Sequence, residues 1–123
     1  LPMGYVRSGH KDHGRQNQIE GKMEPGTKVV VIEDLISTGG SVLEVVDVLR
    51  QAGAQVLGIA SIFTYGLQKG VERLAAADVV NYSLSDFDTL SKVAAAEGYI
   101  ADKDIAKLTA FQKNPQNPAW MKL

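Results

Sequence analysis

Two adjacent carboxylates, Glu33 and Asp34, stand between an apolar run and a loop that is rich in glycine and hydroxyl side chains. The loop, residues 37–41, reads Ser-Thr-Gly-Gly-Ser and precedes apolar residues at helical spacing. Such a turn at a helix N-terminus offers backbone N–H groups and the positive end of the helix dipole, which together favour a phosphate. Carboxylates accept hydrogen bonds and suit hydroxyl groups instead. A phosphate beside a diol describes a ribose 5-phosphate.

The same stretch excludes two other nucleotide-binding loops. No Gly-Lys-Ser/Thr follows it, so it is not a Walker A loop, and the G-x-G-x-x-G of a dinucleotide fingerprint is missing. An ordinary strand–turn–helix with a glycine-rich turn is the remaining alternative. Such a turn does not need two adjacent carboxylates before it, so we favour a ligand site.

A second group of reactive side chains lies nearer the N-terminus. Both histidines of the chain, His10 and His13, share a polar segment with Arg7, Lys11 and Arg15. One interpretation is a solvated surface loop. A metal site is weaker, because no set of carboxylate and histidine ligands surrounds the two histidines. The third is an anion clamp, since Lys and Arg neutralise oxyanions and His adds a donor; a neighbouring phosphate loop adds weight to it.

The elements that must position these residues alternate along the chain. Apolar runs predict strands over 3–6, 28–33, 56–63 and 79–82, and residues 8–22 predict a long loop. Helical spacing predicts helices between 42 and 53, around 71–75, between 85 and 98, and from about 102 to 115. Ser85 and Asp88 are the expected cap residues of the third helix. This order predicts an α/β fold with an open, mostly parallel sheet and flanking helices.

Composition restricts the class of protein further. A chain of 123 residues, 45% apolar and 22% charged, predicts one soluble domain over residues 1–123. A net charge of −1 gives no case for nucleic-acid binding, and no apolar run is long enough to span a membrane. The absence of cysteine excludes disulfides and fits a cytoplasmic protein. The chain opens on Leu1 without an initiator Met, so we expect an N-terminal truncation.

Two motifs resemble known families. Residues 29–41 resemble the phosphoribosyl diphosphate (PRPP) binding motif of type I phosphoribosyltransferases: an apolar strand, two acids, two spacers and Ser-Thr-Gly-Gly-Ser. Residues 5–14 are similar to the catalytic loop of the orotate phosphoribosyltransferase family, with Ser8 where many members carry a second lysine. The matching residues are Arg7, Lys11, Asp12, His13 and Gly14. The resemblance covers nearly the whole chain and implies the type I phosphoribosyltransferase fold, incomplete at the N-terminus. Members also carry a hood subdomain, an earlier core strand and a pyrophosphate-binding loop, which this sequence lacks.

The resemblance implies transfer of the ribose 5-phosphate of PRPP to orotate, giving orotidine 5′-phosphate and pyrophosphate in pyrimidine (UMP) biosynthesis. It implies a homodimer in which the basic loop, the polar segment with Arg7, Lys11 and His13, acts in the partner's site. It also implies Mg²⁺ that is carried by PRPP without direct protein ligands. The implied catalytic residues are Lys11, His13 and Asp34. The implied PRPP-binding residues are Arg7, Lys11, His13, Glu33, Asp34, Leu35, Ile36, Ser37, Thr38, Gly39, Gly40 and Ser41. Ser37 would also reach orotate. Tyr65 stands where some members place an arginine near the base, and a core role for it is equally favoured.

Three alternatives stay open at this point. A purine phosphoribosyltransferase would share residues 29–41 but lack the Lys-Asp-His-Gly loop. A non-catalytic PRPP-binding regulator would keep the motif without needing Lys11 and His13. Finally, we expect residues 1–123 alone to be an inactive part of an enzyme, because the hood and the pyrophosphate loop are missing.

Overall fold

The computed structural model describes residues 1–7 and 18–123, so the predicted loop over 8–22, with Lys11 and His13, lies largely outside the described residues. Its elements are β1 (Tyr5–Val6), β2 (Ile19–Glu20), β3 (Lys28–Ile36), α1 (Gly40–Gln51), β4 (Gln55–Thr64), α2 (Gln68–Ala76), β5 (Asn81–Asp86), α3 (Phe87–Ala96), α4 (Asp104–Lys113) and the 3₁₀ helix η2 (Pro118–Lys122). None of the described helices combines the length and apolar character needed to cross a bilayer.

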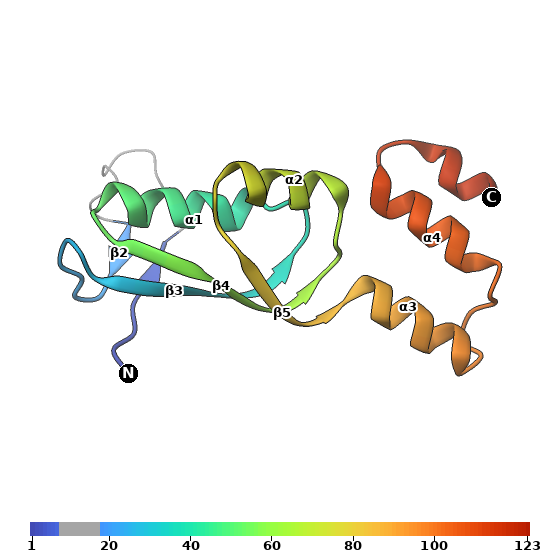
Figure 1. The fold of residues 1–123 in the computed structure, drawn as a ribbon, viewed down its shortest axis with the longest axis horizontal. Coiled ribbons are helices and arrows are strands. Elements are labelled where there is room, and N and C mark those ends of the chain that lie inside the picture. Colours follow the sequence, from blue (N-terminus) through green and yellow to red (C-terminus); the bar gives the residue numbers. More distant parts are fainter. Residues whose placement is uncertain (8–17) are drawn as a thin grey trace.

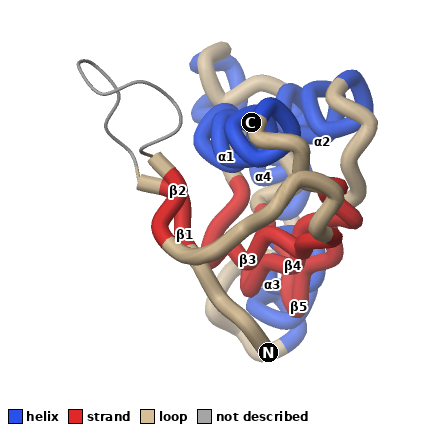
Figure 2. Tube along the Cα trace, turned by 90° about the vertical axis from the view of Figure 1, so that its left-hand side faces the viewer, coloured by secondary structure: helices blue, strands red, loops and turns tan. Residues whose placement is uncertain are grey.

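A three-stranded parallel sheet, in the order β3-β4-β5, forms the centre of the molecule (Figure 1). Both crossovers are helical, α1 between β3 and β4 and α2 between β4 and β5. A separate antiparallel pair, β1 and β2, stands beside β3 (Figure 2). The predicted α/β fold with an open, mostly parallel sheet and flanking helices is therefore confirmed.

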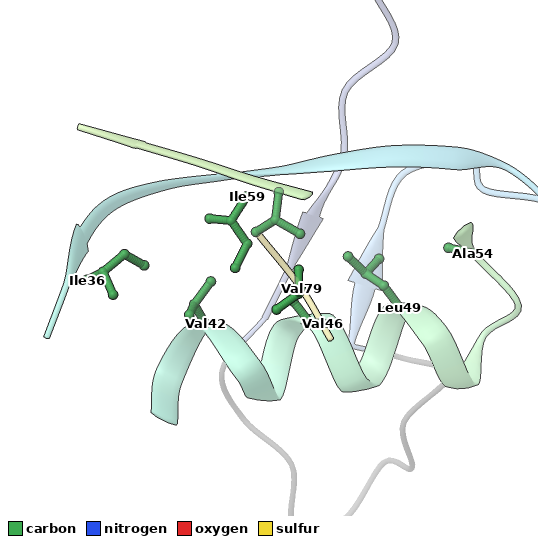
Figure 3. Close-up of a cluster of buried hydrophobic side chains, with 8 residues drawn as sticks. Ile36, Val42, Val46, Leu49, Ala54, Ile59 and Val79 are labelled. Carbon is green, nitrogen blue, oxygen red and sulfur yellow. The ribbon is translucent and has the colours of Figure 1, made fainter. Parts of the chain in front are cut away.

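The core lies between one face of the sheet and α1 (Figure 3). Val42, Val46 and Leu49 recur at spacings of four and three residues, so they lie on one side of the helix. They meet Val31 of β3 and Ile59 of β4, and Ile59 is only 1% exposed. This packing fixes α1, and with it the loop that leads into α1, against the carboxyl end of β3.

The opposite face of the sheet is also apolar but is not covered by α1 or α2, which lie together on one side (Figure 1). The exposed side chains on this bare face include Val30, Ile32, Ile62, Tyr82 and Leu84. Ile32 is 77% exposed and Leu84 87% exposed. Strands that are apolar on both faces are typical of parallel sheets with helices on both sides.

Several predicted boundaries were wrong. Strand β3 runs to Ile36, three residues beyond its expected end, so both acids lie inside the strand. Residues 19–20, which were expected to be loop, form β2, whose pairing with β1 is a non-local contact that no local pattern reveals. The strand expected over 79–82 lies instead at Asn81–Asp86. Val79 belongs to the core but precedes the strand, which explains the error.

The predicted cap of the third helix was also wrong. Asp86, not Ser85, is the N-cap of α3, and its carboxylate accepts hydrogen bonds from the backbone N–H and the hydroxyl of Thr89 at 2.7 and 3.1 Å. These bonds lower the pKa of Asp86. Pro118 opens η2, because proline suits the first turn of a helix.

Candidate functional site

The loop between β3 and α1, residues 37–41, is called the phosphate loop below. Gly39 is the N-cap of α1, with a φ of +83° that glycine adopts without strain, and no side chain caps the helix. Within the described residues, no backbone N–H from Ser37 to Ser41 donates to a protein group. The loop therefore presents free donors at the positive end of a twelve-residue helix, which suits an anion.

The two acids lie just before this loop but point to different faces of β3. Successive side chains alternate along a strand, so half-buried Glu33 shares the helix-covered face with Val31, and exposed Asp34 lies on the bare face. The backbone N–H of Asp34 donates to a carboxylate oxygen of Glu33 at 3.3 Å. Burial raises the pKa of Glu33, and the neighbouring Asp34 adds to the rise. The structure thus offers two carboxylates on two sides of one strand, near the loop.

Leu35 and Ile36 connect the acids to the loop. Ile36 is 2% exposed and belongs to the core, so its side chain cannot touch a ligand. Its carbonyl accepts a hydrogen bond from the backbone N–H of Tyr65 at 3.0 Å, which ties the end of β3 to the end of β4. Leu35 is 46% exposed. A PRPP contact by either residue remains a prediction, and for Ile36 it could involve only the backbone.

Arg7 is the one described residue of the predicted anion clamp, and it is not brought to the phosphate loop. Arg7 forms an ion pair with Glu20 across the β1–β2 pair, with 3.0 Å between Nε and Oε1. The strands β1 and β2 lie beside the amino end of β3, whereas the phosphate loop lies at the carboxyl end of β3 (Figure 1). Lys11 and His13 lie outside the described residues. Their predicted roles, and the role of Arg7 in PRPP binding, remain predictions.

Tyr65 belongs to a row of aromatic rings. Its ring centroid lies 5.4 Å from that of Phe63 and 5.7 Å from that of Phe87. The row continues to Phe111 and Trp120, so it joins the end of the sheet to α3, α4 and η2. The backbone carbonyl of Tyr65 accepts a hydrogen bond from the Gln112 side chain at 2.9 Å. These contacts favour the packing role over a base contact.

Helix α2 supplies neighbours of the phosphate loop that the sequence did not reveal. The guanidinium Nη1 of Arg73 lies 3.4 Å from the carbonyl oxygen of Thr38, and Gly70 packs against the backbone of Ser37. The available signal was a glycine inside an amphipathic helix, because such a glycine costs stability and often marks a close backbone approach. In the described part of the chain, no group of three acidic or histidine side chains could hold a metal ion.

Comparison with known proteins agrees with this geometry. Residues 2–93 match the model of the family described as "Phosphoribosyl transferase domain". The chain is 60% identical over 121 residues to the orotate phosphoribosyltransferase of Bacillus cereus (strain B4264), covering 98% of this chain and 58% of that protein. This chain thus spans a little over half the length of that curated relative.

Solved structures give the same family. The orotate phosphoribosyltransferase of Aeropyrum pernix matches with a TM-score of 0.66 and 32% identity, over 81% of this chain and 54% of that chain. The Mycobacterium tuberculosis enzyme in complex with PRPP matches with a TM-score of 0.59 and 26% identity, over 70% of this chain and 48% of that one. With a family model that covers three strands of the sheet and the phosphate loop, the chain belongs to the phosphoribosyl transferase domain family.

Proposed function

We propose that the full-length protein containing these residues transfers the ribose 5-phosphate of PRPP to orotate, producing orotidine 5′-phosphate and pyrophosphate. The observation that carries this proposal is the phosphate loop, whose N–H groups have no protein acceptor and which follows a pair of carboxylates after two intervening residues, in a chain that is 60% identical to an orotate phosphoribosyltransferase. We infer from the same relatives that the reaction serves pyrimidine biosynthesis in the cytoplasm.

In this reaction N1 of orotate, having released its proton to solvent, bonds to the anomeric carbon of PRPP as the bond to pyrophosphate breaks and its electron pair leaves with the pyrophosphate. The N–H groups and hydroxyls of Ser37–Ser41 hold the 5′-phosphate, which fixes the ribose for attack. Asp34 and Glu33, on opposite faces of β3, accept hydrogen bonds from the ribose hydroxyls or from metal-bound water, and their charge suits an anomeric carbon that becomes positive. Ser37 reaches the edge of orotate.

The leaving group carries most of the negative charge that develops in the reaction. Lys11, His13 and Arg7 neutralise it when the basic loop covers the site and excludes water. In the isolated chain Arg7 pairs with Glu20 beside the amino end of β3, away from the phosphate loop. This separation supports the proposal that the loop serves the site of a second subunit in a homodimer.

Magnesium accompanies PRPP in this scheme. The donor set fits such an ion only loosely, because Glu33 and Asp34 lie on opposite faces of β3 and cannot chelate it together. Either carboxylate could hold an ion through a water molecule. When bound, the ion neutralises part of the charge on the pyrophosphate.

The proposal is tested with the full-length protein, PRPP, magnesium and a panel of bases: orotate, uracil, adenine, guanine and hypoxanthine. Release of pyrophosphate is measured with each base, with a no-base sample as the control. We expect release with orotate alone, together with an absorbance change as orotate is consumed. Release with a purine would support the purine alternative, and PRPP binding without release from any base would support a regulator.

A further inference from the structure

We propose that Gly70 and Arg73, on one face of α2, are positioning residues that turn the N–H groups of the phosphate loop toward the phosphate. This inference rests on the proposed function for the identity of the ligand, since it assigns the loop to the 5′-phosphate end of PRPP. It adds a second helix to a site that is otherwise built from β3 and α1.

Gly70 brings the backbone of α2 directly against the loop. A Cβ atom on Gly70 would lie 2.6 Å from the carbonyl oxygen of Ser37, a distance that real Cβ atoms do not show. A Cβ atom on Gly39 would lie 3.8 Å from both Cα and O of Gly70. Because glycine weakens a helix relative to alanine, its presence in the first turn of α2 is explained by this close approach.

Arg73 makes the second contact one turn further along the helix. Its Nη1 donates to the carbonyl oxygen of Thr38 at 3.4 Å, and the same nitrogen lies 3.4 Å from the position of a Cβ atom on Gly40. Arg73 is half-buried, yet no carboxylate of the described residues lies within 4.0 Å of its guanidinium. A positive charge without an acidic partner therefore stands beside the loop, where it would attract an anion.

These two contacts fix the orientation of two consecutive peptide units. The carbonyl of Ser37 faces Gly70, and the carbonyl of Thr38 faces Arg73. In a planar trans peptide the N–H points away from the carbonyl of the same unit. The N–H groups of Thr38 and Gly39 are therefore directed away from α2, side by side, as in other anion-binding turns of the backbone.

Two variants of the full-length protein test the assignment. Gly70→Ala pushes the Ser37 carbonyl without changing charge, and Arg73→Gln removes the charged donor. The control is Arg50→Gln, because Arg50 also donates to backbone carbonyls, those of Ala77 and Asp78 at 2.6 and 3.0 Å, but away from the loop. Binding of ribose 5-phosphate and of pyrophosphate is measured by calorimetry, together with kcat and KM for PRPP.

We expect the Kd of ribose 5-phosphate and the KM for PRPP to rise about tenfold in both variants, as for loss of one charge-assisted hydrogen bond. The Kd of pyrophosphate and the kcat should stay within about twofold, because the phosphate end is remote from the breaking bond. Arg73→Lys should recover part of the affinity, since it keeps the charge without the guanidinium geometry. Arg50→Gln should lower the melting temperature and leave both Kd values unchanged.

An unchanged Kd of ribose 5-phosphate in Arg73→Gln would overturn the inference, and so would an equal rise for pyrophosphate. If Gly70→Ala does not fold, Arg73→Gln with its lysine rescue still decides the question. A wild-type protein that binds ribose 5-phosphate but releases no pyrophosphate from PRPP with orotate would refute the proposed function and leave the role of α2 standing.

Discussion

Gly39 is the residue of the phosphate loop that has a left-handed backbone, so a methyl group there would strain the loop. A Cβ atom there would lie 3.8 Å from Gly70 and 4.0 Å from Cγ of Leu74, which are ordinary van der Waals distances, so alanine fits sterically. The cost of Gly39→Ala comes from the backbone, because a φ of +83° is left-handed. A left-handed conformation costs an alanine about 1–2 kcal/mol.

We expect the loop to relieve part of that cost by moving. Relief turns at least one N–H away from the phosphate, and loss of one charge-assisted hydrogen bond costs about 1.5–3 kcal/mol, or about 10- to 150-fold in Kd. We therefore expect Gly39→Ala to lower the free energy of unfolding by about 1–2 kcal/mol or less and to weaken ribose 5-phosphate binding by about tenfold or more.

The matched control is Gly98→Ala. Gly98 has a φ of +81° and nothing within 4 Å of its Cβ position, so it carries the same backbone cost far from the loop. Urea denaturation and calorimetric titration with ribose 5-phosphate measure the two effects separately in the full-length protein. Equal stability losses with equal, unchanged Kd values would refute the assignment of the loop to the phosphate.

Further predictions follow from the strand acids, the basic loop and the core. Asp34→Asn should lower turnover by about 10²-fold without changing the circular dichroism spectrum; near-normal turnover would reject its role. Lys11→Ala should lower kcat much more than it weakens PRPP binding, because its contact strengthens as pyrophosphate leaves; raised KM with unchanged kcat would reject this. In the 123-residue chain, Ile59→Ala should cost about 2–5 kcal/mol in urea denaturation and Ile32→Ala less than about 1 kcal/mol, whereas equal losses would contradict the two-face assignment. Because the pKa of Asp86 is lowered in the folded protein, its cap stabilises the fold fully above the usual Asp pKa, and this contribution is lost as the pH falls through the lowered value. The difference in unfolding free energy between wild type and Asp86→Ala should therefore shrink on acidification. A difference that does not change with pH would contradict this.

The phosphate loop could be predicted from the sequence because the residues that form it are adjacent in the chain. Acids, glycines and hydroxyls stand at fixed offsets between Glu33 and Ser41, and the apolar spacing of α1 follows at once. The parallel direction of the strands was also accessible, since strands that alternate with helices favour parallel neighbours. Val42, Val46 and Leu49, whose spacing helped to predict the helix, are buried, and Val45 of the same pattern is half-buried.

The sequence could not reveal contacts that join distant segments. The pairing of β1 with β2 and the approach of Gly70 to Ser37 depend on tertiary placement. Asp86 caps α3 although Ser85 and Asp88 offered a plausible pattern, because the end of β5 sets which residue leaves the sheet. The bare apolar face, with Ile32 and Leu84, became visible only once both crossover helices were seen on the same side.

The most direct test of the account is an amide NMR titration of the full-length protein with ribose 5-phosphate. We predict that the largest chemical-shift changes occur at the backbone N–H groups of Ser37–Ser41, above all those of Thr38 and Gly39. Addition of PRPP should shift the same N–H signals further in the same direction. The assignment of the site would be contradicted if the signals of this loop did not change and the largest changes lay elsewhere, for example at the crevice between α3 and α4 that Ser91 and Ile105 line.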